Sequence, residues 1–299
     1  MIMKTLVDFH QFIKGACFFD EPLSKHTTLG IGGRVGLWLE PQDTEDLKCM
    51  IKELQSRELT WKIIGNGSNI LAGERGLSNA VIRLNNFNQI SCSGDIIRAG
   101  SGAGLGKLVS FSLEHSLTGL EFLAGIPGVV GGAARVNAGA QGCSISDVLK
   151  TVRMLNNKGE VYDLSAREIV SGYRYIDISD DTIILGAEFC LSRGDTEEMY
   201  NTVAGYLASR NDSFPACPNA GCIFKNPAEL NAGALIEKAG LKGFSIGNAG
   251  VSREHGNIFV NLGRADAGCV MALIRHVRKE VYARTGINLE LEVNCWGDI

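Results

Sequence analysis

Glycine is concentrated in a few short stretches of this chain, and that clustering limits the fold more than any other feature. The chain has 37 glycines in 299 residues, and they gather at GIGG (30–33), GNGSN (65–69), GSGAGLG (100–106) and GIPGVVGGAARVNAGAQG (125–142). Residues without a side chain let backbone N–H groups approach a ligand closely. One such loop alone is more often an ordinary turn, but four of them together favour a site for a phosphorylated ligand.

The glycine spacing differs from the fingerprint of dinucleotide-binding Rossmann domains, which is GxGxxG after a strand. The stretch at 65–70 has only the first two of those three glycines, and the stretch at 100–106 has glycines at every second position. A standard Rossmann site is therefore a poor fit.

Hydrophobic periodicity predicts a mixture of helices and strands with a domain boundary near Gly194. Before the boundary we predict strands at 35–40, 61–65, 79–84 and within 180–194, helices at 44–57 and about 105–113, and a hairpin turn at NNKG (156–159). After it we predict helices at 196–209, 233–241 and about 265–284. The segment 287–296 alternates apolar and polar residues, which predicts a half-buried strand with Glu290 and Glu292 on its polar face.

Composition and charge narrow the possible partners. A formal charge of -4 and a pI near 5.8 give no basic surface for a nucleic acid, and no apolar stretch is long enough to span a membrane. The amino terminus, MIMKTLVDFHQFIKG, lacks the form of an export signal. Nine cysteines without a CxxC pair indicate free thiols in the cytoplasm and argue against a structural metal site.

One cysteine lies in an informative place, the loop PNAGCIFKNP at 218–227. From the residues alone, Cys222 has four interpretations: a small buried residue, a metal ligand, a nucleophile or an acid. The first is the most common for a lone cysteine in an apolar loop.

Seven stretches resemble, in order and spacing, the UDP-N-acetylenolpyruvoylglucosamine reductase family, flavoproteins of bacterial peptidoglycan synthesis. They are PLSKHTTLGIGG, IIGNGSNIL, GIPGVVGGAARVNAGAQG, SGYRY, PNAGCIFKNP, GLKGFSIGNAGVSREHGNIFVN and LELEV, and together they cover nearly the whole chain. The chain runs directly from SGYRY to its next strand, so it resembles the form of the family that lacks an inserted loop.

The resemblance implies an α+β protein with a two-part FAD-binding domain of the vanillyl-alcohol-oxidase type and a smaller α/β substrate-binding domain. We expect the first at 1–194, with parts at about 1–84 and 85–194, and the second at 195–299. The residues expected to line the non-covalent flavin are Gly65, Asn66, Gly67, Ser68, Asn69, Gly125, Ile126, Pro127, Gly128, Asn137, Ala138 and Gly139.

The implied reaction reduces an enolpyruvyl ether to a lactyl ether, so that UDP-N-acetylglucosamine enolpyruvate becomes UDP-N-acetylmuramate. Hydride passes from NADPH, by way of FAD, to the terminal methylene carbon, and negative charge builds on the carbon next to the carboxylate. The resemblance assigns Arg174 to the carboxylate, because a guanidinium offers it paired donors. Glu292 is expected to help as a protonated acid with a raised pKa.

Cys222 stands where the family usually has serine, and the resemblance makes it the general acid that protonates that carbon. A thiol with a reference pKa of about 8.5 is mostly protonated at neutral pH and is a far stronger acid than an alcohol. Further expected substrate contacts are Tyr173, Lys225, Asn226 and His255.

Three residues depart from the family pattern: Gln141 replaces a common aromatic, Ser213 a frequent basic residue, and Asn294 an arginine. They leave the mode of diphosphate binding open. Two other functions stay open: an FAD-linked oxidase of the same fold with flavin tethered to His26, and a nucleotide-sugar binding protein without activity. The sequence does not fix the oligomeric state, for which a monomer is plausible.

Overall fold

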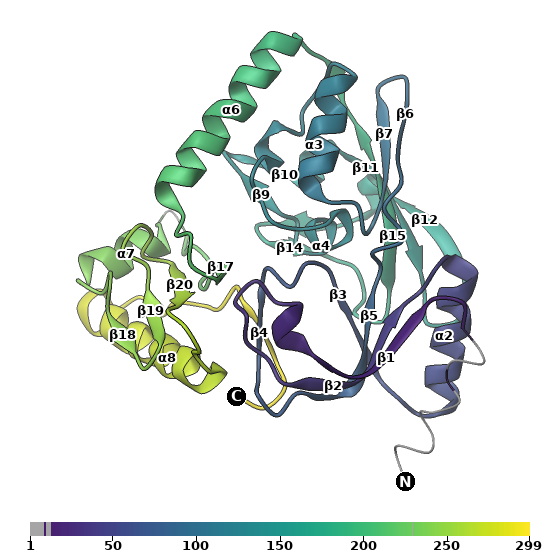
Figure 1. Cartoon of the computed structure of the whole chain (residues 1–299). Coiled ribbons are helices and arrows are strands. Elements are labelled where there is room, and N and C mark those ends of the chain that lie inside the picture. The colour runs from purple at the N-terminus through teal and green to yellow at the C-terminus, as the bar shows by residue number, and fades with distance from the viewer. Residues whose placement is uncertain (1–8, 10–12, 229) are drawn as a thin grey trace. The chain divides into compact units, whose positions relative to one another are not determined.

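The computed structural model describes residues 9, 13–228 and 230–299. The prediction that the amino terminus is not an export signal rests on a stretch that lies mostly outside those residues. The chain forms two compact units and passes between them several times (Figure 1). Unit 1 comprises 1–19, 37–65 and 79–208, and unit 2 comprises 20–36, 66–78 and 209–299. Two short segments from the first quarter of the chain therefore belong with its carboxyl-terminal third.

Unit 1 is built around a five-stranded antiparallel sheet in the order β12-β11-β15-β7-β6. Its strands are β6 (Ile90–Ser93), β7 (Ile96–Gly100), β11 (Leu149–Leu155), β12 (Val161–Ser165) and β15 (Ile183–Cys190). Helices α3 (Leu105–Glu114) and α4 (Val130–Arg135) contribute to the core beside it, as does α5 (Ile145–Val148) (Figure 1). The predicted NNKG turn joins β11 to β12, which pair antiparallel from Leu155–Val161 to Thr151–Ser165.

Short hairpins and turns connect these elements. The hairpins are β9 (Gly139–Ala140) with β10 (Cys143–Ser144) and β13 (Ser171–Gly172) with β14 (Tyr175–Ile176), and β8 (Leu117–Thr118) pairs with the distant β16 (Ser192–Arg193). The 3-10 turns of unit 1 are Glu121–Leu123 and Ala166–Glu168, and unit 2 contains a third at Leu23–Lys25. Helix α6 (Thr196–Ser213) begins in unit 1 and ends in unit 2.

A second sheet has the order β1-β2-β5-β3. Its strands are β1 (Ala16–Pro22), β2 (Arg34–Glu40), β3 (Trp61–Ile64) and β5 (Leu77–Arg83), and α2 (Thr44–Ser56) packs its buried residues into the same core. Asp43 caps α2 by accepting a hydrogen bond from the Asp46 amide at 2.8 Å. Asp46 is itself buried, and its carboxylate accepts from the amides of Lys14, Gly15 and Gln42. A buried carboxylate with three such donors is stabilised where it stands.

Unit 2 has a four-stranded sheet in the order β17-β20-β19-β18, with α7 and α8 against it (Figure 1). Its elements are β4 (Ile70–Ala72), β17 (Asn219–Cys222), α7 (Ala232–Lys238), β18 (Ser245–Ile246), β19 (Ala249–Val251), β20 (Ile258–Asn261), α8 (Ala267–Thr285) and β21 (Asn294–Trp296). Helix α8 ends at Gly286, whose φ of 72° is the left-handed conformation that favours glycine. The apolar residues at helical spacing on α8 are all buried: Val270, Leu273, Ile274, Val277 and Val281.

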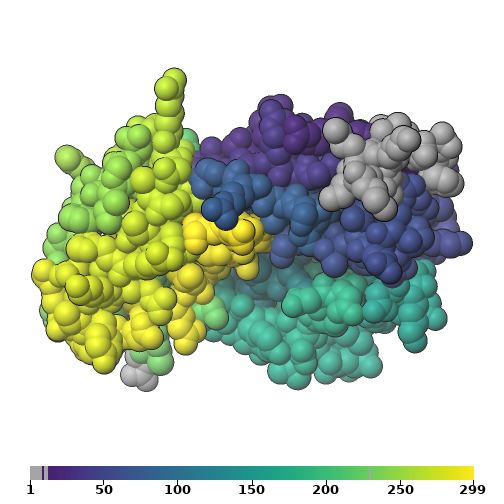
Figure 2. Space-filling view, turned by 90° about the horizontal axis from the view of Figure 1, so that it is seen from below, coloured from purple at the N-terminus to yellow at the C-terminus, as the bar shows by residue number. Residues whose placement is uncertain are grey.

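The carboxyl-terminal segment corrects one prediction. Only Asn294–Trp296 forms a strand, β21, which pairs in parallel with β4, so that the yellow end of the chain lies against a blue segment in Figure 2. Leu289 and Val293 are buried as the alternation predicts, but Trp296 is buried and Cys295 is exposed. Burial at Cys295 and Trp296 is therefore the opposite of what the alternation predicts. The reason is that residues 294–296 pair with β4, whereas residues 290–292 lie beside residues 223–225.

No helix in the described part of the chain is long and apolar enough to cross a membrane.

Candidate active site

Cys222 and Glu292 lie on neighbouring backbone segments of unit 2. Cys222 ends β17 and pairs with Ile258 of β20. The residues after it turn to a second neighbour: the Glu292 amide donates to the Ile223 carbonyl at 2.8 Å, and the Lys225 amide to the Glu290 carbonyl at 2.8 Å. Ile223 and Phe224 beneath are fully buried. The predicted general acid and the predicted acidic partner are therefore one residue apart across a hydrogen-bonded pair of segments.

A buried asparagine that the sequence did not single out fixes this arrangement. Asn257 is 2% exposed, and its side-chain oxygen accepts from the Phe224 amide at 2.9 Å while its nitrogen donates to the Phe224 carbonyl at 2.7 Å. Its own carbonyl accepts from the Ile223 amide at 2.9 Å. The motif GNIFVN contains this residue, but an asparagine before an apolar run is no distinctive signal. Asn257 anchors the segment that follows Cys222.

Asn69, expected at the flavin, is also bonded to this region. Its side-chain nitrogen donates to the Glu292 carbonyl at 3.2 Å, and its carbonyl accepts from the Asn294 amide at 3.0 Å. The GNGSN loop therefore holds the backbone of Glu292. Within the loop, Gly67 has a φ of 61°, and an added Cβ would lie 2.0 Å from the His26 carbonyl oxygen, so only glycine fits.

Two expected substrate contacts have partners within the protein. The Asn226 side-chain oxygen accepts from the Ala232 amide at 3.0 Å and so supports the start of α7. Lys225 places its Nζ 3.8 Å from Glu290, and both side chains are well exposed. An exposed pair at that distance leaves the ammonium able to exchange its partner for a ligand.

His255 belongs to a cluster with Arg210 and Phe214. The Phe214 and His255 rings lie 5.5 Å apart, and the Arg210 guanidinium lies 3.9 Å from the Phe214 centroid. The pKa of His255 is lowered, mostly by burial and then by the positive charges of Lys242 and Arg210. The negative charge of Glu237 acts in the opposite direction. Because Nδ1 accepts from the Asn257 amide at 3.2 Å, the proton of the neutral ring is on Nε2.

Arg210 was not predicted as a site residue. Burial lowers the pKa of its guanidinium, and the charge of Cys222 opposes that effect. In this part of the sequence only Ser213 stands out, because it departs from the family pattern.

Arg174 lies in unit 1, on the two-residue turn between β13 and β14. Its φ is 55°, in the left-handed region that costs a non-glycine residue free energy. The guanidinium carbon lies 5.2 Å from the Tyr173 ring centroid, and Tyr173 and Tyr175 are each about half exposed. Only residues 177–182 separate β14 from β15, so no insertion follows this hairpin.

The glycine-rich loops of unit 1 come together as a flavin nucleotide requires. Gly104 pairs with Val129, the Leu105 amide donates to the Gly128 carbonyl at 3.1 Å, and the Val130 amide to the Ala103 carbonyl at 2.9 Å. A Cβ added to Gly65 would lie 2.8 Å from a Val129 methyl group. Backbone from three glycine-containing loops thus lies close together, which fits the close approach of a pyrophosphate.

The residues at 137–139 connect these loops to other parts of unit 1. Asn137 is buried, and both ends of its side chain bond to backbone groups. The Ala138 carbonyl accepts from the Ile145 amide at 2.9 Å, and Gly139 pairs with Ser144.

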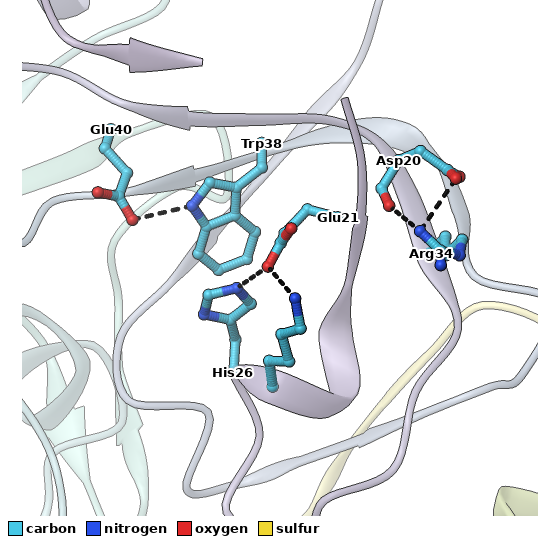
Figure 3. Close-up of polar contacts among 7 residues, drawn as sticks. Asp20, Glu21, His26, Arg34, Trp38 and Glu40 are labelled. Carbon is cyan, nitrogen blue, oxygen red and sulfur yellow. Dashed lines mark hydrogen bonds and ion pairs between the residues drawn. The ribbon is translucent and has the colours of Figure 1, made fainter. Parts of the chain in front are cut away.

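His26, the expected tether of the oxidase alternative, has an acidic neighbour in unit 2. Its Nε2 lies 3.0 Å from a Glu21 carboxylate oxygen, which also lies 3.6 Å from Lys25 (Figure 3). In the same view Arg34 bonds to Asp20, and in unit 1 Trp38 donates to Glu40 at 2.9 Å.

Comparison with known proteins first defines the class. Residues 36–165 match the family model described as an FAD binding domain, which makes the chain a flavin-binding protein. Residues 212–296 match the UDP-N-acetylenolpyruvoylglucosamine reductase carboxyl-terminal domain.

Whole-chain relatives then give the particular family. The chain is 39% identical over 292 residues to the UDP-N-acetylenolpyruvoylglucosamine reductase of Syntrophus aciditrophicus, covering 96% of this chain and 94% of that one. It is 39% identical over 300 residues to that of Halalkalibacterium halodurans, covering 99% and 100%. The crystal structure of the Thermus caldophilus reductase matches with a TM-score of 0.83 at 34% identity, over 96% of this chain and 100% of that one. The chain belongs to the UDP-N-acetylenolpyruvoylglucosamine reductase family.

Proposed function

We propose that this chain uses FAD and NADPH to reduce UDP-N-acetylglucosamine enolpyruvate to UDP-N-acetylmuramate, in the cytoplasm, for peptidoglycan synthesis. Membership of the family supports this, and the observation that carries it is the pairing of the Cys222 and Glu292 segments. The uninterrupted run from β14 to β15 supports the loop-lacking form. In the proposed division of labour, residues 1–194 supply most of the flavin site and 195–299 the substrate site.

The flavin is held by the glycine-rich backbone at Gly65–Asn69, Gly125–Gly128 and Asn137–Gly139. Bound FAD supplies the transfer of two electrons and a proton from NADPH to the terminal methylene carbon of the enolpyruvyl group. The chain's own residues orient the substrate and handle the charge and the second proton. Arg174 binds the enolpyruvyl carboxylate through paired donors, which stabilises the charge that spreads into it.

Cys222 supplies the second proton to the carbon next to the carboxylate. We assign to Arg210 the stabilisation of the thiolate once it forms, because the charge of Cys222 opposes the lowering of the Arg210 pKa. Glu292 supports the same charge only as a protonated acid, because an ionised carboxylate would repel it. His255 offers a neutral Nε2–H donor, and Tyr173, Lys225 and Asn226 complete the proposed substrate contacts.

The visible absorption spectrum of the purified protein tests this function. We expect a flavin spectrum that NADPH bleaches without oxygen and that returns when UDP-N-acetylglucosamine enolpyruvate is added. A flavin that returns only with oxygen would instead favour an oxidase, and yellow colour in an acid pellet would indicate a covalent tether. A colourless protein that cannot be reconstituted with FAD would favour a binding protein.

A further inference from the structure

One buried asparagine of unit 1 joins a glycine-rich loop to the hairpin that carries Arg174. Asn137 is 3% exposed and follows Val136, the residue that caps the carboxyl end of α4. Its side-chain nitrogen donates to the Gly172 carbonyl at 2.9 Å, and its side-chain oxygen accepts from the Ser146 amide at 3.0 Å. These partners fix the orientation of the carboxamide, because a carbonyl needs a donor and an amide needs an acceptor.

The bonded carbonyl lies immediately before the turn. Gly172 ends β13, and Tyr173 and Arg174 form the turn that leads into β14. The turn is exposed: Tyr173 is 55% exposed and Tyr175 51%, and Arg174 is in the left-handed conformation. A strained, exposed turn keeps one conformation only when its surroundings hold it.

Helix α4 holds the other end of the same segment. Arg135 donates to the carbonyls of Ile178 and Ser179 at 2.8 and 3.0 Å and pairs with Asp180. The carbonyls bonded to Arg135 lie four residues or more after Arg174, whereas the carbonyl bonded to Asn137 lies two residues before it. The Asn137 bond is therefore nearer to Arg174 than the bonds of Arg135 are.

We propose that Asn137 is a positioning residue that places the Arg174 guanidinium for the substrate carboxylate. The inference rests on the function proposed above. It differs from the expected role of Asn137 as a flavin contact, because its side chain acts on the hairpin and not on the cofactor. A shift of about 1 Å in such a group can cost on the order of 100-fold in rate.

Two substitutions separate this role from simple folding. Asn137→Asp keeps the volume and the acceptor for Ser146 but places an acceptor opposite the Gly172 carbonyl. Asn137→Gly removes both bonds and suits the φ of 44° at this position, so it adds no backbone strain. Asn86→Asp is the matched control, because Asn86 in unit 1 also donates its amide to a backbone carbonyl, that of Pro41 at 3.0 Å.

The experiment measures the two half-reactions of each holoenzyme separately, in anaerobic stopped flow. We expect both Asn137 variants, measured per bound flavin, to lose far more of their reoxidation by substrate than of their bleaching by NADPH. Their reoxidation by UDP-N-acetylglucosamine enolpyruvate falls by roughly 10- to 100-fold. Asn86→Asp leaves both half-reactions unchanged.

A double-mutant cycle with Arg174→Ala decides between direct and indirect action. If Asn137 acts through Arg174, Asn137→Gly causes little further loss in that background. If Asn137→Gly slowed reoxidation as much in the Arg174→Ala background as in the wild type, the proposal would be wrong. It would also be wrong if the variant lost FAD affinity but each bound flavin was reoxidised at the normal rate. Wild-type reoxidation by the substrate keeps this result distinct from failure of the proposed function, which would abolish the reaction in every protein tested.

Discussion

The two regions that carry the proposed catalytic residues are built in opposite ways. In unit 2, Cys222 and Glu292 lie on segments joined by backbone hydrogen bonds over the fully buried Ile223 and Phe224. In unit 1, Arg174 lies on a two-residue turn with exposed neighbours and a left-handed backbone. The first region is fixed by the core, whereas the segment that carries Arg174 receives hydrogen bonds from the side chains of Asn137 and Arg135. A proton donor must be aimed at one carbon, whereas a guanidinium has several donors with which to reach a carboxylate.

The largest expected effect tests the fixed region. Cys222→Ala removes the proton donor, so we expect reoxidation of the reduced flavin by substrate to slow by roughly 10²- to 10⁴-fold, which is the usual contribution of a positioned general acid. Bleaching by NADPH should not change. Cys222→Ser supplies the hydroxyl usual in the family and should restore much of the rate. A loss below about tenfold in Cys222→Ala would exclude the proposed role.

The second effect compares the two buried asparagines. Asn257→Ala leaves both the amide and the carbonyl of Phe224 without their side-chain partners in the core, at a cost of about 2–4 kcal/mol in the free energy of unfolding. Urea denaturation followed by circular dichroism measures it.

Asn137→Gly provides the contrast for that measurement. It should lower the midpoint less, because the hairpin that it releases is exposed, while it lowers the reoxidation rate as described above. If Asn257→Ala and Asn137→Gly lowered the free energy of unfolding equally, the proposed difference between the two regions would be wrong.

Much of this architecture could be predicted from the sequence, for identifiable reasons. Helices α2, α3 and α8 follow their apolar spacing, and the NNKG turn forms the hairpin expected of it. The segment 287–296 was only partly predictable. Alternation of apolar and polar residues predicts burial only while a segment lies beside one neighbouring segment, and this one changes its neighbour at Asn294. The family resemblance named Arg174, Cys222 and Glu292.

The supporting roles of three asparagines were beyond the reach of sequence reasoning, although Asn69 and Asn137 were expected at the flavin. Asn69, Asn137 and Asn257 each act on backbone far along the chain, at separations of 223, 35 and 33 residues. A side chain that bonds to backbone leaves no pattern in its partner's residue type, since any residue supplies the carbonyl. Arg210 was missed for a related reason, because only the fold brings α6 to Cys222.

The smallest expected effect concerns the pH dependence of the fixed region. Burial, with Lys242 and Arg210, lowers the pKa of His255, and Glu237 only partly offsets them. The folded protein then binds fewer protons than the unfolded chain once the pH falls below the ordinary histidine value of about 6.5. The free energy of unfolding should therefore decline as the pH falls from about 6.5 through the folded-state pKa, and be unaffected by this group above that range.

His255→Gln should flatten that decline, because glutamine does not titrate. His276→Gln is the control, since it removes another histidine of unit 2 that stacks on a phenylalanine, Phe244. The measurement is the urea midpoint at a series of pH values from 7.5 to about 5.5, with each variant compared to the wild type. Equal slopes for His255→Gln and the wild type would mean that the ring takes up its proton in the folded state without cost. His255 would then be a flexible surface group, and the fixed region would end at Asn257.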